Sequence, residues 1–105
     1  MEIKYFIQKN ELKAVLMGDF DEYAAPYVRL SLDTLLKDLE CVQSPTLVLD
    51  FSGVTFMDST GIGVLLGRFK KFSKNNVKIY IKNAKGHVNK ILEMTGIYEI
   101  MPKIS

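Results

Sequence analysis

The chain has one cysteine, one histidine and no tryptophan among its 105 residues. Cys41 therefore cannot form an internal disulfide, and with His87 alone neither a histidine-based metal site nor a conventional catalytic triad is well supported. The sequence also lacks an apolar run long enough to span a bilayer and a secretory leader pattern. These absences argue against a disulfide-stabilised secreted protein and favour a cytoplasmic protein with no metal site, no catalytic triad and no membrane partner.

Charge is divided unevenly along the chain, although the net charge is only +2. Residues 1–66 carry five basic and ten acidic side chains, whereas residues 67–105 carry nine basic and two acidic ones. The lysines of the second part are spread over several predicted elements without an aromatic platform, so we expect no direct nucleic-acid partner. The first part would offer a negative face to a basic partner if the fold gathers Asp19, Asp21, Glu22 and Asp58.

Hydrophobic patterns predict strands and helices in alternation after an initial β-hairpin over 3–7 and 12–17. The elements predicted after the hairpin are a helix that begins at Pro26 and ends before Pro45, strand 46–51, helix 60–73, strand 77–81, a helix that stops near Gly96, and a short strand over 97–101. This order indicates an α/β fold, with a mixed, mostly parallel sheet, an antiparallel N-terminal hairpin and three to four helices. No linker or repeat interrupts the pattern, so residues 1–105 are expected to form one domain.

The most informative segment is Phe56-Met57-Asp58-Ser59-Thr60-Gly61-Ile62-Gly63, where a buried strand leads into an amphipathic helix. Free backbone N–H groups and aligned peptide dipoles make the first turn of a helix favourable for a carboxylate or a phosphate. Asp58 or Ser59 can serve simply as the N-cap of this helix. Alternatively, the Ser59 hydroxyl stands in the open as a functional group.

Three glycines fall inside this one predicted helix, at Gly61, Gly63 and Gly67. Each costs about 1 kcal/mol relative to alanine at an interior position, so a compensating reason is needed. One reason is close packing of the helix on the sheet. Another is a bare surface that lets a second protein reach Ser59, and the two can hold for different glycines.

The same segment, continued to Arg68, closely resembles the phosphorylation site of the anti-sigma factor antagonists, small bacterial proteins built on the STAS domain. Two further segments resemble the family pattern, Gly18-Asp19-Phe20-Asp21 followed by Ala24-Ala25-Pro26 and, more weakly, Ile91-Leu92-Glu93-Met94-Thr95-Gly96-Ile97. Ala24 stands where the family usually has a capping threonine, so we expect a less well capped start of that helix. Together the three segments span most of the chain.

This resemblance implies that Ser59 is phosphorylated by an anti-sigma factor that is itself a serine kinase. The unmodified protein would bind this kinase and free a sigma factor for transcription, phosphorylation would abolish the binding, and a serine phosphatase would restore it. The residues expected at the partner interface are Asp21, Asp58, Thr60, Gly61, Ile62 and Gly63. The resemblance further implies a protein that is monomeric when free, needs no cofactor and is not an enzyme. It fits both the sporulation sigma-F and the general-stress sigma-B pathways.

A nucleotide-binding regulatory module of the same STAS type is the alternative, because glycines follow a strand at Gly61, Gly63 and Gly67. Their spacing is one residue longer than the dinucleotide fingerprint, and no acidic residue stands about 20 positions later to hold a ribose. A phosphate-binding P-loop motif is also absent. The sequence therefore favours the interaction module.

Overall fold

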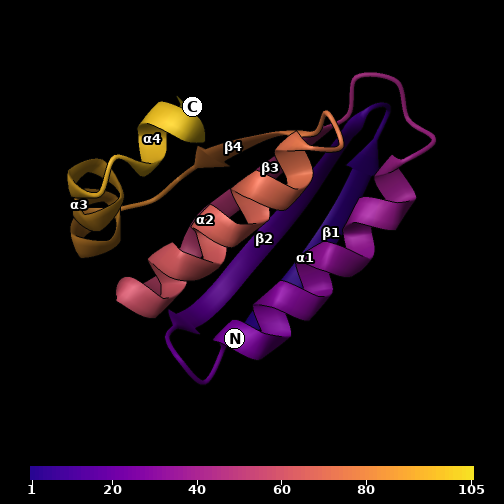
Figure 1. Ribbon diagram of the computed structural model, residues 1–105. Coiled ribbons are helices and arrows are strands. Elements are labelled where there is room, and N and C mark those ends of the chain that lie inside the picture. The colour runs from indigo at the N-terminus through magenta and orange to yellow at the C-terminus, as the bar shows by residue number, and fades with distance from the viewer.

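The computed structural model describes residues 1–105, which form a five-stranded sheet of strand order β1-β2-β3-β4-β5 (Figure 1). Strands β1 and β2 are antiparallel, and every later pairing is parallel. The elements in chain order are β1 (Glu2–Gln8), β2 (Glu11–Phe20), α1 (Ala25–Leu39), β3 (Thr46–Met57), α2 (Ser59–Ser73), β4 (Lys78–Lys82), α3 (Gly86–Met94), α4 (Ile97–Ile100) and β5 (Lys103–Ile104). The predicted α/β class, hairpin and mostly parallel sheet are confirmed.

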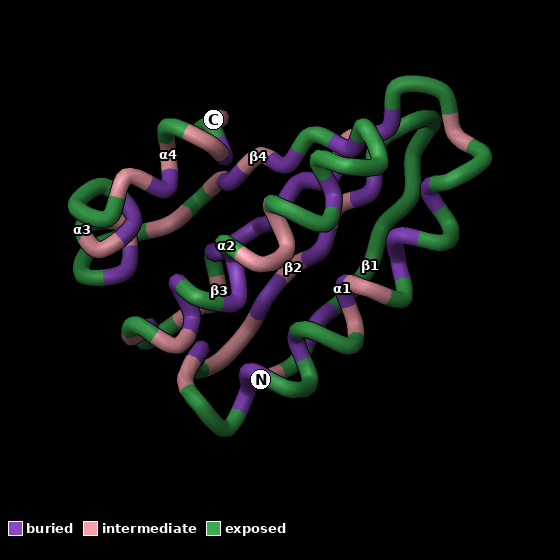
Figure 2. The backbone as a smooth tube through the Cα atoms, viewed as in Figure 1, coloured by how far each residue is buried: buried purple, intermediate pink, exposed green.

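Helices α1 and α2 lie side by side over one face of the sheet (Figure 1), and the buried residues lie along the strands and on parts of both helices (Figure 2). Helix α1 buries Val28, Leu32, Leu35, Leu36 and Leu39, which recur at helical spacing. Arg68 and Lys71 of α2 form ion pairs of 3.0 and 3.2 Å with Asp33 of α1. None of the four helices combines the length and the apolar character that crossing a bilayer requires.

Two predicted boundaries are wrong. Strand β3 continues to Met57 instead of ending at residue 51, because its second half pairs with the end of β2 through two register irregularities. Residues 97–101 do not form a strand: Gly96 at φ 78 ends one helix, and α4 follows at once. Ile97 and Met101 are both buried and four residues apart, which is helical spacing, and the short last strand lies at Lys103–Ile104 instead.

Helical spacing predicts one apolar stripe in the helix over 60–73, formed by Ile62, Leu65, Leu66, Phe69 and Phe72, and the structure corrects it at one position. Leu65 and Phe72 are fully buried and Phe69 is partly buried, but Leu66 is 40% exposed. Val64 is buried instead. It lies one turn before Arg68, and the ion pair of Arg68 with Asp33 places this side of α2 against α1.

Asp50 is the one buried acidic residue, and it ties β3 to the segment that follows β4. Its Oδ1 accepts hydrogen bonds from the backbone N–H of Ser52 at 2.9 Å and from Nδ2 of Asn83 at 3.2 Å. Burial acts to raise the pKa of Asp50, but the hydrogen bonds from Ser52 and Asn83 and the positive charge of Lys82 outweigh it. The pKa of Asp50 is therefore held below its ordinary value of 3.8.

We expect the Asp50 carboxylate to stabilise the fold at neutral pH and to lose this effect in acid. A carboxyl group whose pKa is lower in the folded state contributes stability above its unfolded pKa, and this contribution disappears as the pH falls through the folded value. The free energy of unfolding of Asp50→Asn should lie below that of the unmodified sequence at pH 7, and the two should converge as the pH falls below 3.8. Urea denaturation across this range measures the difference, and a gap independent of pH would contradict the assignment.

Candidate functional site

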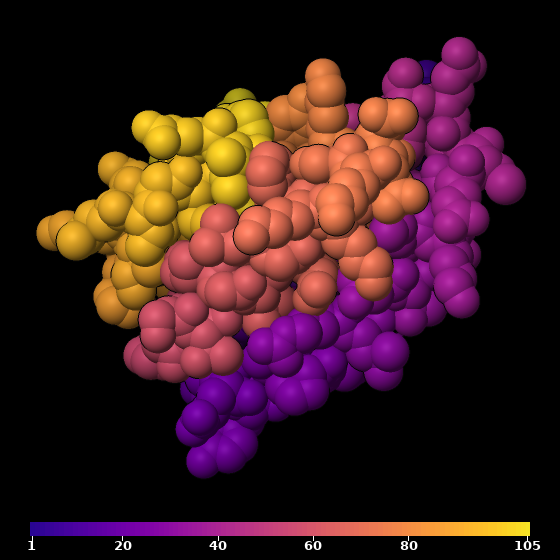
Figure 3. Space-filling model, in the orientation of Figure 1, coloured from indigo at the N-terminus to yellow at the C-terminus, as the bar shows by residue number.

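The carboxyl ends of β2 and β3 lie next to each other at one end of the sheet. Phe20 and Met57 are register partners in this parallel pair. The residues that follow them, Asp21 and Asp58, therefore leave the sheet at the same end of the strands. In Figure 1 the loop between β2 and α1 and the start of α2 lie at the same end of the molecule, and Figure 3 shows both exposed there. Two acidic residues that are far apart in the sequence are thus brought together.

Asp58 is the N-cap of α2. Its backbone is extended, at φ −125 and ψ −170, and its Oδ1 accepts hydrogen bonds from the backbone N–H groups of Thr60 at 2.9 Å and Gly61 at 3.4 Å. Ser59 is the next residue, the first of the helix, and it is exposed. Of the two capping candidates, Asp58 satisfies the free amides, and the Ser59 hydroxyl makes no hydrogen bond to the protein.

Asp21 stabilises the start of α1. Its Oδ1 accepts hydrogen bonds from the backbone N–H groups of Tyr23 and Ala24, both at 3.1 Å. Ala24 itself provides no side-chain cap, as expected from the sequence. The Asp21 carboxylate supplies the acceptor three residues earlier, so the loop is better fixed than a missing threonine suggests.

A hollow of about 320 Å³ lies beside Asp21 and is lined by Met1, Asp19, Asp21, Tyr23, Ala24 and Tyr27. The Asp19 carboxylate accepts a hydrogen bond of 2.7 Å from the Thr55 hydroxyl, which joins the ends of β2 and β3. Tyr23 is 84% exposed and Tyr27 is 45% exposed. Of the four acidic residues predicted to gather, Asp19 and Asp21 line this hollow beside the two exposed tyrosines, whereas Glu22 does not line it. Two carboxylates in the hollow disfavour a phosphate ligand there.

The tyrosines are site residues that the sequence analysis missed. Tyr27 lies in the first turn of α1, off its apolar stripe, so a helical projection would have placed it on the exposed side, whereas Tyr23 lies in the loop before the helix, where no periodic pattern applies. Phe56 was named in the sequence analysis but given no role: it is 42% exposed at the end of β3, and its ring lies 6.0 Å from that of His87. Alternation along β3 could not reveal it, because that part of the strand was predicted as a loop.

The three glycines of α2 have two different surroundings. A Cβ atom on Gly61 would lie 2.7 Å from Cγ of Met57 and 3.0 Å from the carbonyl oxygen of Phe20, so Gly61 allows close packing on the strands. A Cβ atom on Gly63 or Gly67 would meet nothing within 4 Å. Packing therefore accounts for Gly61 but not for Gly63, which lies exposed one turn after Ser59.

The remaining residues expected at the interface differ in how accessible they are. Thr60 is half-buried, and its backbone N–H is used by the Asp58 cap. Gly61 is buried and Ile62 is 9% exposed, so they support the surface from below and do not form its outer layer.

The change Gly63→Ala should stabilise the domain by up to about 1 kcal/mol, because alanine is the better helix former and its methyl group has open space. If the bare surface at Gly63 serves a partner, the same change should weaken partner binding. Gly67→Ala is the matched control, with equal open space but one turn farther from Ser59. Gly61→Ala should lower the stability by about 1–2 kcal/mol through overpacking. Thermal unfolding and partner titration measure these effects, and a lower melting temperature for Gly63→Ala would contradict the account.

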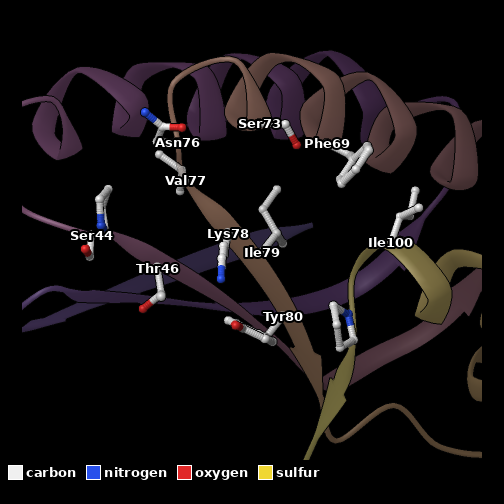
Figure 4. A pocket seen from close by; sticks show the side chains of 12 residues that line it. Ser44, Thr46, Phe69, Ser73, Asn76, Val77, Lys78, Ile79, Tyr80 and Ile100 are labelled. Carbon is white, nitrogen blue, oxygen red and sulfur yellow. The ribbon is translucent and has the colours of Figure 1, made fainter.

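The larger of the two cavities lies at the amino-terminal ends of the parallel strands, away from Ser59 (Figure 4). It measures about 870 Å³ and is formed by the amino-terminal ends of β3 and β4, the end of α2 and α4, with Thr46, Ser73, Ile79 and Ile100 among its lining residues. Because β2, β3 and β4 are parallel, this cavity and Ser59 lie at opposite ends of the strands. The candidate site is thus a surface, separate from the main cavity.

Comparisons with known proteins identify the family of this chain. A model of the STAS domain matches residues 7–105. The anti-sigma F factor antagonist of Paenibacillus polymyxa is 31% identical over 102 residues, which cover 97% of this chain and 85% of that protein. The anti-sigma-B factor antagonist of Bacillus subtilis is 29% identical over 93 residues, which cover 89% of this chain and 81% of that protein.

The fold is also that of a solved anti-sigma factor antagonist, SpoIIAA, whose structure is known in unphosphorylated and phosphorylated forms. The phosphorylated form, from Bacillus, is similar to this chain with a TM-score of 0.72 at 21% identity, over 99% of this chain and 92% of that one. The match over residues 7–105 and the identity to the Paenibacillus protein together show that the chain belongs to the STAS domain family.

Proposed function

We propose that this chain is an anti-sigma factor antagonist whose binding is switched off by phosphorylation of Ser59. The unmodified form binds an anti-sigma factor that is a serine kinase and thereby frees the sigma factor. A serine phosphatase regenerates this form. The observation that carries the proposal is an exposed serine hydroxyl, free of hydrogen bonds to the protein, at the start of α2 in a chain related to two such antagonists.

The local geometry supports Ser59 as an acceptor of phosphate. Because Asp58 caps the helix, modification of Ser59 removes no hydrogen bond that the fold needs. The open space around Gly63 leaves room on the same side of the helix for the active site of a kinase. The amides and dipole of the first helical turn also favour an added negative charge.

The surface around Ser59 supports a protein partner of basic character. Asp19, Asp21 and Asp58 supply negative charge at the carboxyl ends of β2 and β3. Tyr23 and Tyr27 supply exposed aromatic area beside them. Complementary charge speeds association and sets orientation, whereas aromatic side chains often provide the affinity. We assign Asp21, Asp58, Thr60 and Gly63 to this contact surface, with Gly61 and Ile62 beneath it.

Mass spectrometry after incubation with the cognate kinase and ATP tests the acceptor. The unmodified sequence and Thr60→Ala should each gain one phosphate, whereas Ser59→Ala should gain none. Thr60 is the matched control because it is the adjacent hydroxyl and is half-buried, in contrast to the exposed Ser59. Full phosphorylation of Ser59→Ala would show that the acceptor lies elsewhere.

The two relatives carry the names of two pathways, sigma F and sigma B. A chain that cannot be phosphorylated should remain bound to its partner, so Ser59→Ala is the preferred form for isolating it from cells. The anti-sigma factor that co-purifies with Ser59→Ala identifies the pathway.

A further inference from the structure

The sheet has one long unpaired edge, formed by β1. Strand β1 lies at the end of the strand order and pairs only with β2, through all seven of its residues (Figure 1). It contains no proline, no glycine and no register irregularity. The opposite edge strand, β5, has only two residues. A long, regular edge presents a row of free backbone groups that can pair with another strand.

Exposed apolar side chains accompany this free edge. Tyr5, Phe6 and Ile7 are 39%, 54% and 72% exposed, and they are consecutive, so they project on both faces of the sheet. Exposed edges in soluble proteins are usually protected by charges, proline or a bulge. In β1 the only charged residues are Glu2 and Lys4, which both lie in its first half.

We propose that a second copy of this chain pairs with β1 in antiparallel orientation, about a two-fold axis at Tyr5. This register uses the whole strand, because Tyr5 is its central residue. The residues opposite one another in the two copies are Glu2 and Gln8, Ile3 and Ile7, Lys4 and Phe6, and Tyr5 and Tyr5. Apolar residues thus meet apolar residues, no like charges face each other, and the lysine meets an aromatic ring.

The neighbouring registers are less favourable, which argues for a copy of the same chain in this one arrangement. A two-fold axis at Lys4 would place two lysines directly opposite each other. An axis at Phe6 would leave Glu2 and Ile3 without partners. Phe6 already accepts a cation on its β2 side, where Nζ of Lys13 lies 5.4 Å from the ring centroid. Its other side is open to Lys4 of the second copy.

The arrangement joins two five-stranded sheets into one of ten strands and leaves both candidate sites free. A two-fold axis perpendicular to the sheet reverses the strand direction, so the carboxyl ends of β2 and β3 point opposite ways in the two copies. The two Ser59 residues then lie at opposite ends of the extended sheet. This proposal departs from the monomer that the family resemblance implies, and it is independent of the proposed function.

Disulfide cross-linking tests the register. Cys41 is exposed, so the experiment uses a Cys41→Ser background. Tyr5→Cys places two cysteines directly opposite each other, with Cα atoms about 4.5–5.5 Å apart, within reach of a disulfide. Phe6→Cys is the matched control: its two cysteines would be offset by two residues, about 8 Å apart, beyond that reach. Under mild oxidation, Tyr5→Cys should form covalent dimers at least roughly tenfold faster than Phe6→Cys. Equal rates would overturn the register.

Sedimentation across a concentration series tests the dimer itself, without any cysteine. The unmodified sequence should dimerise, and Ile7→Lys should raise the dissociation constant roughly tenfold or more by placing an ammonium group opposite Ile3. Met94→Lys is the control, because Met94 is as exposed as Ile7, at 77%, but lies on α3. A monomer at every concentration, or equal effects of the two lysines, would overturn the proposal. Ile7→Lys should leave the affinity for the anti-sigma factor unchanged, which separates this test from that of the proposed function.

Discussion

Phosphorylation of Ser59 is expected to weaken binding of the anti-sigma factor about a hundredfold or more, which corresponds to about 2.7 kcal/mol. The phosphate adds about −1.5 to −2 charges at neutral pH. In the free protein this charge lies in solvent at the start of α2, where the helix amides favour it and salt screens its repulsion from Asp58. In the complex the phosphate has to be desolvated beside Asp58, or it occupies space that the partner needs, so binding is lost.

The fold itself should not change on phosphorylation. Asp58 keeps the helix capped, and Ser59 gives up no hydrogen bond to the protein. Circular dichroism should therefore be the same for both forms, and amide exchange should differ only near residues 52–67. Calorimetric titration of the anti-sigma factor with each form gives the affinity. Widespread loss of exchange protection, or equal affinities, would contradict a switch that acts locally.

Charge reversal at Asp21 should produce the second large effect, a loss of affinity of roughly tenfold or more, or about 1.4 kcal/mol. Asp21→Lys places a positive charge at the end of the strands where Asp58 also lies. It also removes the oxygen that accepts hydrogen bonds from the backbone N–H groups of Tyr23 and Ala24. Both changes act on the same proposed contact surface. Titration with the anti-sigma factor measures the loss.

Two control variants separate the causes. Asp21→Asn keeps an acceptor oxygen for the loop and removes only the charge. Its affinity should therefore lie between those of the unmodified sequence and Asp21→Lys. Glu22→Lys reverses the adjacent charge, which is exposed and makes no side-chain hydrogen bond, and should have little effect. Equal losses for Asp21→Lys and Glu22→Lys would mean that only the overall charge of the region matters.

Much of the fold could be predicted because long elements with regular apolar spacing dominate it. The hairpin, the helices α1 and α2 and the parallel order all follow from such patterns. The second half of β3 could not be predicted, since Ser52, Gly53 and Thr55 interrupt the apolar run and the strand is held there by its pairing with β2. Helix α4 was missed because four residues are too few to show a helical period.

The candidate site could be located from the sequence, but its internal roles could not be assigned. Capping statistics allow either Asp58 or Ser59 at the helix start, and only the backbone geometry distinguishes the cap from the free hydroxyl. The glycines likewise look alike in sequence, whereas a Cβ atom would clash at Gly61 and find open space at Gly63. Such differences depend on which strand lies beneath each helical residue.

Release of a sigma factor from its anti-sigma factor tests the central claim most directly. The complex of the two is formed with a fluorescently labelled sigma factor, and the chain is then added in increasing amounts while the anisotropy is followed. The unmodified chain should lower the anisotropy to that of the free sigma factor, and the form phosphorylated at Ser59 should leave it unchanged over the same range. No release by the unmodified chain, or equal release by both forms, would contradict the proposed antagonist.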